Sequence, residues 1–186
     1  MRLSIVTQPT VEPVTLDEMK QYLKIPLDIE DEKEDDDIES LITSAREAAE
    51  KHCKRGFITQ QWDMILDEFE SAIEIPLGKL QTVDGIYIRD QEYEETLVAS
   101  TAYFVDTISD PGMVLFKRSY SSPMTAMKSG WRIQFTCGYG DAATDLPKTL
   151  ITAIKRIAAY WYENREAHEL PKNAKDLLDA YCILYI

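Results

Sequence analysis

The strongest constraint on the fold is a change in the spacing of apolar residues along the chain. Residues 38–54 place apolar side chains at helical intervals and predict an amphipathic helix. From residue 58 the pattern becomes alternating, and short strand candidates separated by turn residues continue to residue 137. Helical spacing returns at about residue 146. This order, without strand–helix alternation, predicts the α+β class.

Four helices are expected, and local signals mark where some of them begin. Thr15 and Glu18 have the spacing of a capping box, in which each side chain accepts from the backbone of the other. Pro147 suits the first turn of a later helix. The predicted helices span about 15–25, 37–55, 146–166 and 172–184. They form a mainly helical core that carries a small antiparallel β-rich insertion at about 58–137, and residues 1–186 are expected to be one domain.

Two segments before the second helix are expected to lie outside the helices. Residues 1–14 contain Pro9 and Pro13 without a helical period, so they are predicted to be an extended arm. Residues 28–37 form an acidic loop whose last carboxylates favour the positive end of the following helix. The acidic residues expected on an exposed face are Asp28, Glu30, Asp31, Glu32, Glu34, Asp35 and Asp36.

Composition excludes several classes of function. The formal net charge of −13 repels phosphate and argues against ordinary nucleic-acid binding. No apolar stretch approaches the length of a membrane span, and the first residues lack the apolar segment of a secretory signal, so synthesis in the cytoplasm is expected. Three distant cysteines, Cys53, Cys137 and Cys182, fit neither a disulfide framework nor a zinc hook, and are interpreted as buried apolar side chains.

The sequence offers little catalytic chemistry, and no catalytic residue, cofactor or metal site is predicted. The two histidines, His52 and His168, are expected to have structural roles, since His52 falls in the last turn of a helix. The acidic run could in principle hold a hard cation, but it lacks the central glycine of a calcium loop. An alternative hypothesis is therefore a metal-dependent hydrolase that uses the region Asp35–Asp37.

Aromatic and apolar residues near the C-terminus are candidate subunit contacts, because tyrosine and tryptophan are enriched in interface cores. The last six residues carry no charge, so either they fold back onto the core or another chain covers them. The candidate interface residues are Tyr160, Trp161, Tyr162, Leu177, Leu178, Tyr181, Ile183, Leu184 and Ile186.

Taken in order, a series of short motifs resembles the head–tail connector (head-completion or adaptor) proteins of tailed bacteriophages and prophages. Each motif is weak alone, but the ordered set covers nearly the whole chain. The motifs are 13–18 (PVTLDE), 22–25 (YLKI), 38–42 (IESLI), 45–50 (AREAAE), 58–62 (ITQQW), 75–78 (IPLG), 137–140 (CGYG), 146–147 (LP) and 161–166 (WYENRE).

The resemblance implies a structural subunit at the head–tail junction of a virion, without catalytic residues. It implies self-assembly into a ring, typically dodecameric, that docks below the portal protein after DNA packaging and receives a tail or stopper protein. Double-stranded DNA would pass through without sequence-specific binding, and the acidic residues would face this passage or solvent. The last six residues are more apolar than the resemblance to this family leads us to expect. A monomeric cytoplasmic interaction module is the other alternative.

Overall fold

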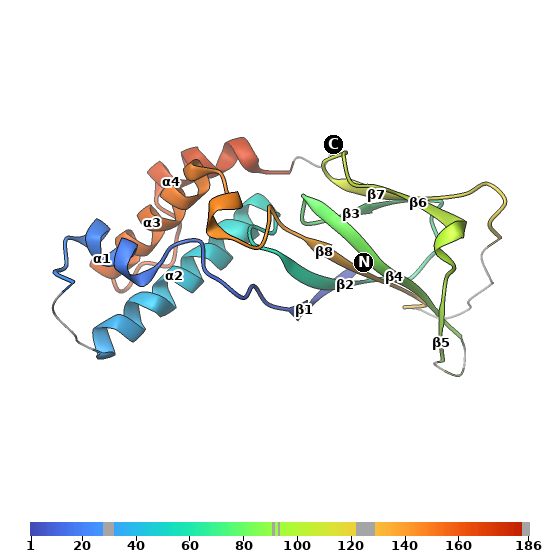
Figure 1. Cartoon of the computed structure of the whole chain (residues 1–186), viewed down its shortest axis with the longest axis horizontal. Coiled ribbons are helices and arrows are strands. Elements are labelled where there is room, and N and C mark those ends of the chain that lie inside the picture. The colour runs from blue at the N-terminus through green and yellow to red at the C-terminus, as the bar shows by residue number, and fades with distance from the viewer. Residues whose placement is uncertain (28–31, 91, 93, 122–128, 184–186) are drawn as a thin grey trace. The chain divides into compact units, whose positions relative to one another are not determined.

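The computed structural model describes residues 1–27, 32–90, 92, 94–121 and 129–183. The chain divides into two compact units (Figure 1). The β unit comprises residues 1–9 and 59–138, and the helical unit comprises residues 10–58 and 139–186. The α+β class predicted from the sequence is confirmed.

The helical unit contains the helices α1 (Leu16–Leu23), α2 (Glu32–Cys53), α3 (Lys148–Glu163) and α4 (Lys172–Leu178), and the 3₁₀ turns η2 (Ala143–Asp145) and η3 (Asp179–Tyr181). Its core forms where the apolar stripes of α2 and α3 meet and α4 packs on α3. Ile42 and Ala45 of α2 are buried in this core together with Ile154 and Ile157 of α3 and Leu178 of α4. Among the described residues, no helix has the length and apolar character needed to cross a membrane.

Local capping signals position α1 as the sequence predicts. The Glu18 amide donates to Thr15 Oγ1 at 3.2 Å, which satisfies one of the free amides of the first turn. The helix ends at Leu23, and the capping residue Lys24 that follows has a left-handed backbone with φ of 62°. The Ile25 amide returns to the Lys20 carbonyl oxygen at 2.9 Å, which closes the C-terminal turn.

Helix α2 begins earlier than expected. Residues 32–37, assigned to an acidic loop on the sequence, are helical, and Glu32, Glu34 and Asp35 lie in the first turn. Carboxylates are stabilised there by the positive end of the helix dipole, so the acidic run promotes helix formation at this site. Asp28, Glu30 and Asp31 lie outside the described residues.

The last helix is shorter than the predicted 172–184. α4 ends at Leu178, η3 follows, and the chain is extended at Cys182 with φ of −67° and ψ of 137°. The Ile183 amide then donates to the Cys53 carbonyl oxygen at the end of α2, at 3.1 Å. This tertiary hydrogen bond, which local sequence does not encode, directs the chain back onto α2.

The β unit consists of two antiparallel sheets. One sheet has the strand order β1-β2-β8-β4-β5, and the other has the order β3-β7-β6. The strands are β1 (Arg2–Thr7), β2 (Gln60–Leu66), β3 (Ala72–Ile75), β4 (Leu80–Arg89), β5 (Glu95–Leu97), β6 (Tyr103–Asp106), β7 (Gly112–Phe116) and β8 (Trp131–Cys137).

Alternating side chains of both sheets share one core. In β8 the pattern is strict, because Trp131, Ile133, Phe135 and Cys137 are buried and the residues between them are half-buried. The ring centroids of Trp131 and Phe116, one from each sheet, lie 5.8 Å apart in an edge-to-face contact. Alternation of period two therefore identifies the buried face of this unit correctly.

The first residues of the segment predicted to be an extended arm form a strand, a pairing that the sequence did not reveal. β1 pairs antiparallel with β2, and Arg2 is opposite Ile65. Leu3 and Ile5 alternate with Arg2 and Ser4, but apart from the half-buried Ile5 the residues of β1 are exposed, so this short alternation does not mark a buried face. Its pairing depends on a strand about sixty positions later in the sequence, which local patterns do not indicate.

The two segments that join the β insertion to the helical unit lie side by side. The Tyr139 amide donates to the Phe57 carbonyl oxygen at 2.9 Å, and Ile58 forms a parallel bridge with Gly140. Within the β unit the same two segments continue as paired strands, where Gln60 is opposite Cys137. The insertion therefore leaves and re-enters the helical unit at neighbouring points of that unit.

Candidate assembly site

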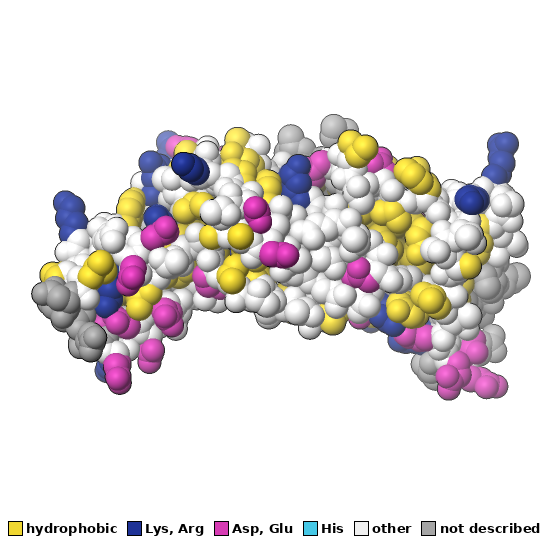
Figure 2. Space-filling view, in the orientation of Figure 1, with side chains coloured by type: hydrophobic (Ala, Val, Ile, Leu, Met, Phe, Trp, Pro, Cys, Tyr) yellow, Lys and Arg dark blue, Asp and Glu magenta, His cyan; other side chains and the backbone are white. Residues whose placement is uncertain are grey.

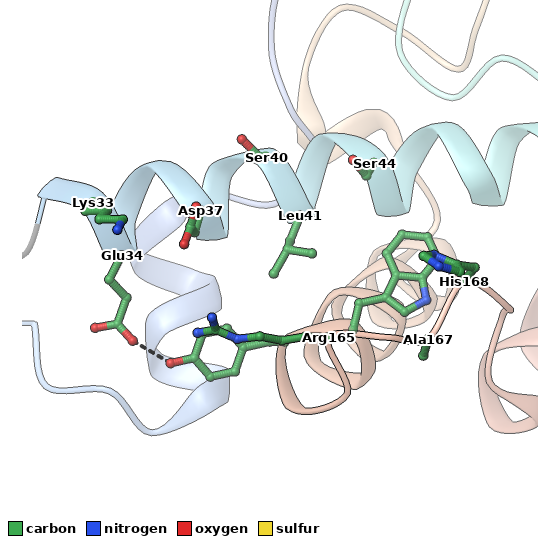
Figure 3. Close-up of a pocket in the computed structure, with 11 residues that line it drawn as sticks. Lys33, Glu34, Asp37, Ser40, Leu41, Ser44, Arg165, Ala167 and His168 are labelled. Atoms are coloured by element: carbon green, nitrogen blue, oxygen red, sulfur yellow. Dashed lines mark hydrogen bonds between the residues drawn. The ribbon is translucent and has the colours of Figure 1, made fainter.

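One candidate contact surface in the helical unit is an open groove of about 770 Å³ between α2 and the end of α3 (Figure 3). One wall is a stripe of α2 residues at helical spacing, and the other is formed by the last turn of α3 and the segment after it. The groove is lined by Lys33, Glu34, Asp37, Ser40, Leu41, Ser44, Trp161, Tyr162, Arg165, Ala167 and His168.

The α2 wall is a polar stripe beside the helix's buried stripe. Asp37, Ser40 and Ser44 are exposed, whereas the neighbouring Ile38 and Ile42 are in the core. Leu41 is half-buried and points from α2 toward the opposite wall (Figure 3). This wall thus presents hydroxyl and carboxylate groups to the groove, with the apolar side chain of Leu41 beside them.

The opposite wall is held in place by hydrogen bonds to backbone carbonyl oxygens. Trp161 Nε1 donates to the Glu169 carbonyl oxygen at 3.2 Å, which fixes the segment that follows α3. Asn164 Nδ2 donates to the Tyr160 carbonyl oxygen at 2.9 Å at the end of α3. Arg165 and His168 are exposed along this segment, so the groove carries charges of both signs.

One contact joins the predicted acidic set to the predicted interface set. The Tyr162 hydroxyl donates to Glu34 Oε1 at 2.5 Å across the groove (Figure 3). This hydrogen bond to the carboxylate, together with burial, raises the pKa of Tyr162 above its ordinary value. Glu34 is therefore engaged with the end of α3 inside the helical unit.

The remaining described acidic candidates differ in their surroundings. Asp35 Oδ1 lies 2.5 Å from Lys20 Nζ, and the Lys20 side chain is only 5 % exposed, so this pair fastens α1 to α2. Glu32 and Asp36 are exposed. Acidic side chains gather on the surface over the start of α2 (Figure 2). The acidic segment thus combines internal ion pairing with an outward carboxylate surface.

The residues of the hydrolase hypothesis do not converge on one point. Asp35, Asp36 and Asp37 occupy successive positions of α2, and successive side chains of a helix diverge by about 100°. Asp35 is directed to Lys20, while Asp37 lines the groove. This arrangement does not provide the shared carboxylate site that such chemistry needs.

The C-terminal interface candidates lie mostly against the helical core. Leu178 and Ile183 are buried, and Leu177 and Tyr181 are half-buried against the same core. Tyr160, Trp161 and Tyr162 are also half-buried, and Trp161 and Tyr162 form part of the groove. Leu184 and Ile186 lie outside the described residues. Up to Ile183, the chain folds back onto its own unit.

Sequence reasoning missed an ion-pair network around Arg46, whose side chain is 4 % exposed. Arg46 Nε donates to Glu12 Oε2 at 2.8 Å, and Nη1 donates to Glu50 Oε2 at 2.8 Å. Glu50 Oε1 also accepts from the Phe57 amide at 2.7 Å, where the chain leaves α2. The i, i+4 spacing of Arg46 and Glu50 was a visible signal, but the link to Glu12 was not.

Comparisons with known proteins give one family match and a fold shared with solved structures. The family model described as phage gp6-like head-tail connector protein matches residues 13–109, just over half of the chain. No curated protein matches. A chain from the neck of an empty gene transfer agent (GTA) particle, computed with C6 symmetry, is similar with a TM-score of 0.81 and 22 % identity. The match covers 100 % of this chain and 97 % of that chain.

Two further solved structures give the same picture. A chain from the virion of a native GTA particle has a TM-score of 0.81 and 22 % identity. A chain from the neck of a native GTA particle, computed with C12 symmetry, has a TM-score of 0.78 and 21 % identity. Each match covers 100 % of this chain and 97 % of the other. At this identity the likeness establishes a common fold over the full length.

Proposed function

The chain belongs to the phage gp6-like head–tail connector family, and on that premise we propose that copies of it close into a ring at the head–tail junction of a virion. The observation that carries the proposal is the family match, supported by a fold shared over the whole chain with subunits of GTA necks. Those necks were computed with C6 and C12 symmetry, and a ring of twelve copies is compatible with both. The role is structural rather than catalytic.

The ring docks below the portal protein after DNA packaging and receives a tail or stopper protein on its other side. The subunit is made in the cytoplasm of the bacterial host and becomes part of the virion. A ring subunit needs two different surfaces that meet head to tail, because a heterologous contact closes only at the correct rotation. The helical unit offers one such surface in the groove between α2 and the end of α3.

The groove and its aromatic wall form one side of the contact between neighbouring subunits. Trp161 and Tyr162 are half-buried in this wall, and the adjacent Tyr160 is half-buried outside the groove; partly exposed aromatic residues favour subunit contacts. Hydroxyl groups of Ser40 and Ser44 together with charges of both signs provide polar partners around them. The apolar chain end, including Leu184 and Ile186, contributes to docking on the neighbouring subunit or partner protein.

The exposed acidic residues Glu32 and Asp36 face solvent or the DNA passage. A channel through which double-stranded DNA slides benefits from negative charge, because lysine or arginine would bind each phosphate. The formal net charge of −13 supports this role. In the double variant Glu32→Lys/Asp36→Lys, double-stranded DNA is expected to bind the assembled ring at low salt and to dissociate as salt rises. Unchanged DNA retention would contradict a position in the DNA passage and would leave these carboxylates facing solvent.

The test of ring formation is light scattering during size exclusion, on the chain alone and mixed with a cognate portal protein. A ring-sized species, either alone or on the portal, is the expected result, and electron microscopy then gives the number of copies. A chain that stays monomeric and does not bind the portal would refute the ring and favour a monomeric interaction module. Failure to assemble without the portal is not sufficient, since portal contact can induce assembly.

The groove is tested by a matched pair of variants. Ser44→Arg places a long charged side chain in the groove, and is expected to abolish ring formation while the subunit stays folded. Gln21→Arg adds the same charge at an exposed position of α1 outside the groove, and should assemble normally. Equal assembly of both variants would show that the groove is not part of the contact surface, without contradicting ring formation.

A further inference from the structure

The end of α2 and the segment after α4 bring three metal-ligating side chains together. His52 Nε2 lies 2.8 Å from Asp179 Oδ1. Cys182 Sγ lies 3.6 Å from the His52 carbonyl oxygen. One ligand atom from each of the three side chains lies within 4.8 Å of the others. His52 is 127 positions from Asp179 and 130 from Cys182, so only the fold assembles this cluster.

The ligand types suit one class of cation. An imidazole nitrogen, a thiolate sulfur and a carboxylate oxygen are the ligands of zinc, whereas calcium and magnesium are bound by oxygen. In a tetrahedral zinc site the ligand atoms lie roughly 3 to 4 Å apart, because zinc bonds are about 2.0 to 2.3 Å long. The observed spacing of up to 4.8 Å therefore requires only small side-chain rotations.

We propose that His52, Asp179 and Cys182 bind a zinc ion through Nε2, a carboxylate oxygen and Sγ, with a water molecule as the fourth ligand. Binding replaces the hydrogen bond between His52 and Asp179. The Cys182 thiol loses its proton to solvent as the Zn–S bond forms, with no change in oxidation state. The Asp179 side chain is 64 % exposed and the His52 side chain 28 % exposed, so both the ion and the water ligand can reach the site.

Cys53 is the buried neighbour of the site rather than a ligand. Its Sγ and that of Cys182 each lie 3.6 Å from the Leu178 carbonyl oxygen, so the two sulfurs adjoin. The Cys53 side chain is fully buried, so its thiol does not reach the accessible side on which the three ligands lie. Cys53 thus lies beneath the site, and the three ligands lie on its accessible side.

The consequence of zinc binding is a stronger connection between the chain end and the end of α2. Without the ion, Asp179 to Ile183 are held by the His52 hydrogen bond, by Arg55 Nε donating to the Tyr181 carbonyl oxygen, and by the Ile183 amide donating to the Cys53 carbonyl oxygen. An ion that binds the folded state only raises stability with the logarithm of its free concentration. The site would therefore control how firmly the segment before the apolar tail is fastened.

The experiment uses the full-length chain, reduced and freed of metal, in titrations with Zn²⁺ and with Co²⁺ as a spectroscopic substitute. We expect one ion per chain, an absorption band from thiolate-to-cobalt charge transfer, and proton release on binding. Cys182→Ser should lose the charge-transfer band. Asp179→Asn, at an exposed position, should bind zinc at least about tenfold more weakly without disturbing the fold.

Two control variants make the assignment specific. His168→Gln changes the other histidine, which is exposed and outside the cluster, and should leave zinc affinity unchanged. Cys53→Ser should keep the charge-transfer band, because Cys53 is not a ligand. Thermal unfolding of every metal-free variant shows whether it is folded before titration.

Three results would overturn the proposal. The first is a wild-type chain that binds no stoichiometric zinc under reducing conditions. The second is a cobalt complex without the thiolate band, or one that Cys182→Ser and Asp179→Asn leave unchanged. The third is a bond between Cys53 and Cys182 in the purified chain that persists under mild reduction, which would make the pair a disulfide instead of a zinc site.

Discussion

Replacing Arg46 by alanine tests whether the buried ion-pair network stabilises the helical unit. Arg46 is tied to Glu12, just before α1, and to Glu50, whose other oxygen accepts from the Phe57 amide. Burial alone would lower the pKa of Arg46, but the hydrogen bond to Glu12 and the charge of Glu50 raise it above the ordinary value. The guanidinium is therefore charged, and its removal leaves two carboxylates without their cation.

The loss of stability depends on how far the Glu12 and Glu50 carboxylates become hydrated once the guanidinium is removed. Removing one partner of a buried ion pair costs about 3 to 5 kcal/mol. The Glu50 side chain is 12 % exposed and the Glu12 side chain 29 % exposed, so both recover part of their hydration. We therefore expect Arg46→Ala to lower the free energy of unfolding of the helical unit by about 3 kcal/mol, at the lower end of that range.

Chemical denaturation followed by helical circular dichroism measures this loss. Arg118→Ala, at an exposed position of the β unit, is the control and should change stability by less than about 0.5 kcal/mol. Arg46→Met keeps the apolar stem, so a comparable loss would assign the effect to charge rather than packing. A loss below about 1 kcal/mol for Arg46→Ala, the range of an exposed pair, would refute the reasoning.

Three further perturbations follow from single contacts. Hydrogen bonding to Arg132 lowers the pKa of Glu95 from 4.5 to about 2. The stabilisation of the folded state by this pair, about 1 kcal/mol or less because the pair is exposed, is therefore present above pH 4.5 and is lost as pH falls toward 2. Glu95→Gln should remove this pH dependence in acid denaturation, and an unchanged slope would contradict it. Thr15→Ala should lower the free energy of unfolding in urea by about 1 kcal/mol, because the Glu18 amide loses the Thr15 hydroxyl that accepts its hydrogen bond. No measurable change would show that this cap does not stabilise α1. Ile157→Ala should cost about 2 to 5 kcal/mol in the same assay, since Ile157 is fully buried, and a cost below about 1 kcal/mol would show that the core refills the cavity.

Local patterns predicted those elements whose stability is decided locally. The capping residues at Thr15 and the strict alternation from Trp131 to Cys137 led to the correct helix start and the correct buried face. The start of α2 was missed because carboxylates favour a helix start both as caps before it and as residues within its first turn. Pattern alone does not separate these two positions.

The features that sequence could not provide all depend on distant partners. β1 exists because β2 supplies its hydrogen bonds, and the end of α4 is set by the bond from Ile183 to Cys53. Of the candidate zinc ligands, His52 and Cys182 were assigned separate structural roles and Asp179 was assigned none, because no short motif connects the three residues. The groove likewise combines residues of α2 with residues after α3, so only the tertiary structure brings them together.

All of the β unit except residues 1–9 lies between α2 and α3 in the sequence, and this order has a consequence for folding during synthesis on the ribosome. The β unit is complete once residue 138 has emerged, whereas the helical unit still lacks α3 and α4 at that point. When the β strands pair, Gln60 comes opposite Cys137, so the two ends of the inserted segment are already neighbours. The conformational entropy that must be lost to bring the end of α2 close to the start of α3 is therefore largely lost before α3 leaves the ribosome. The nascent chain can thus fold its middle first, and the helical core closes last around two ends that the strands have already brought together.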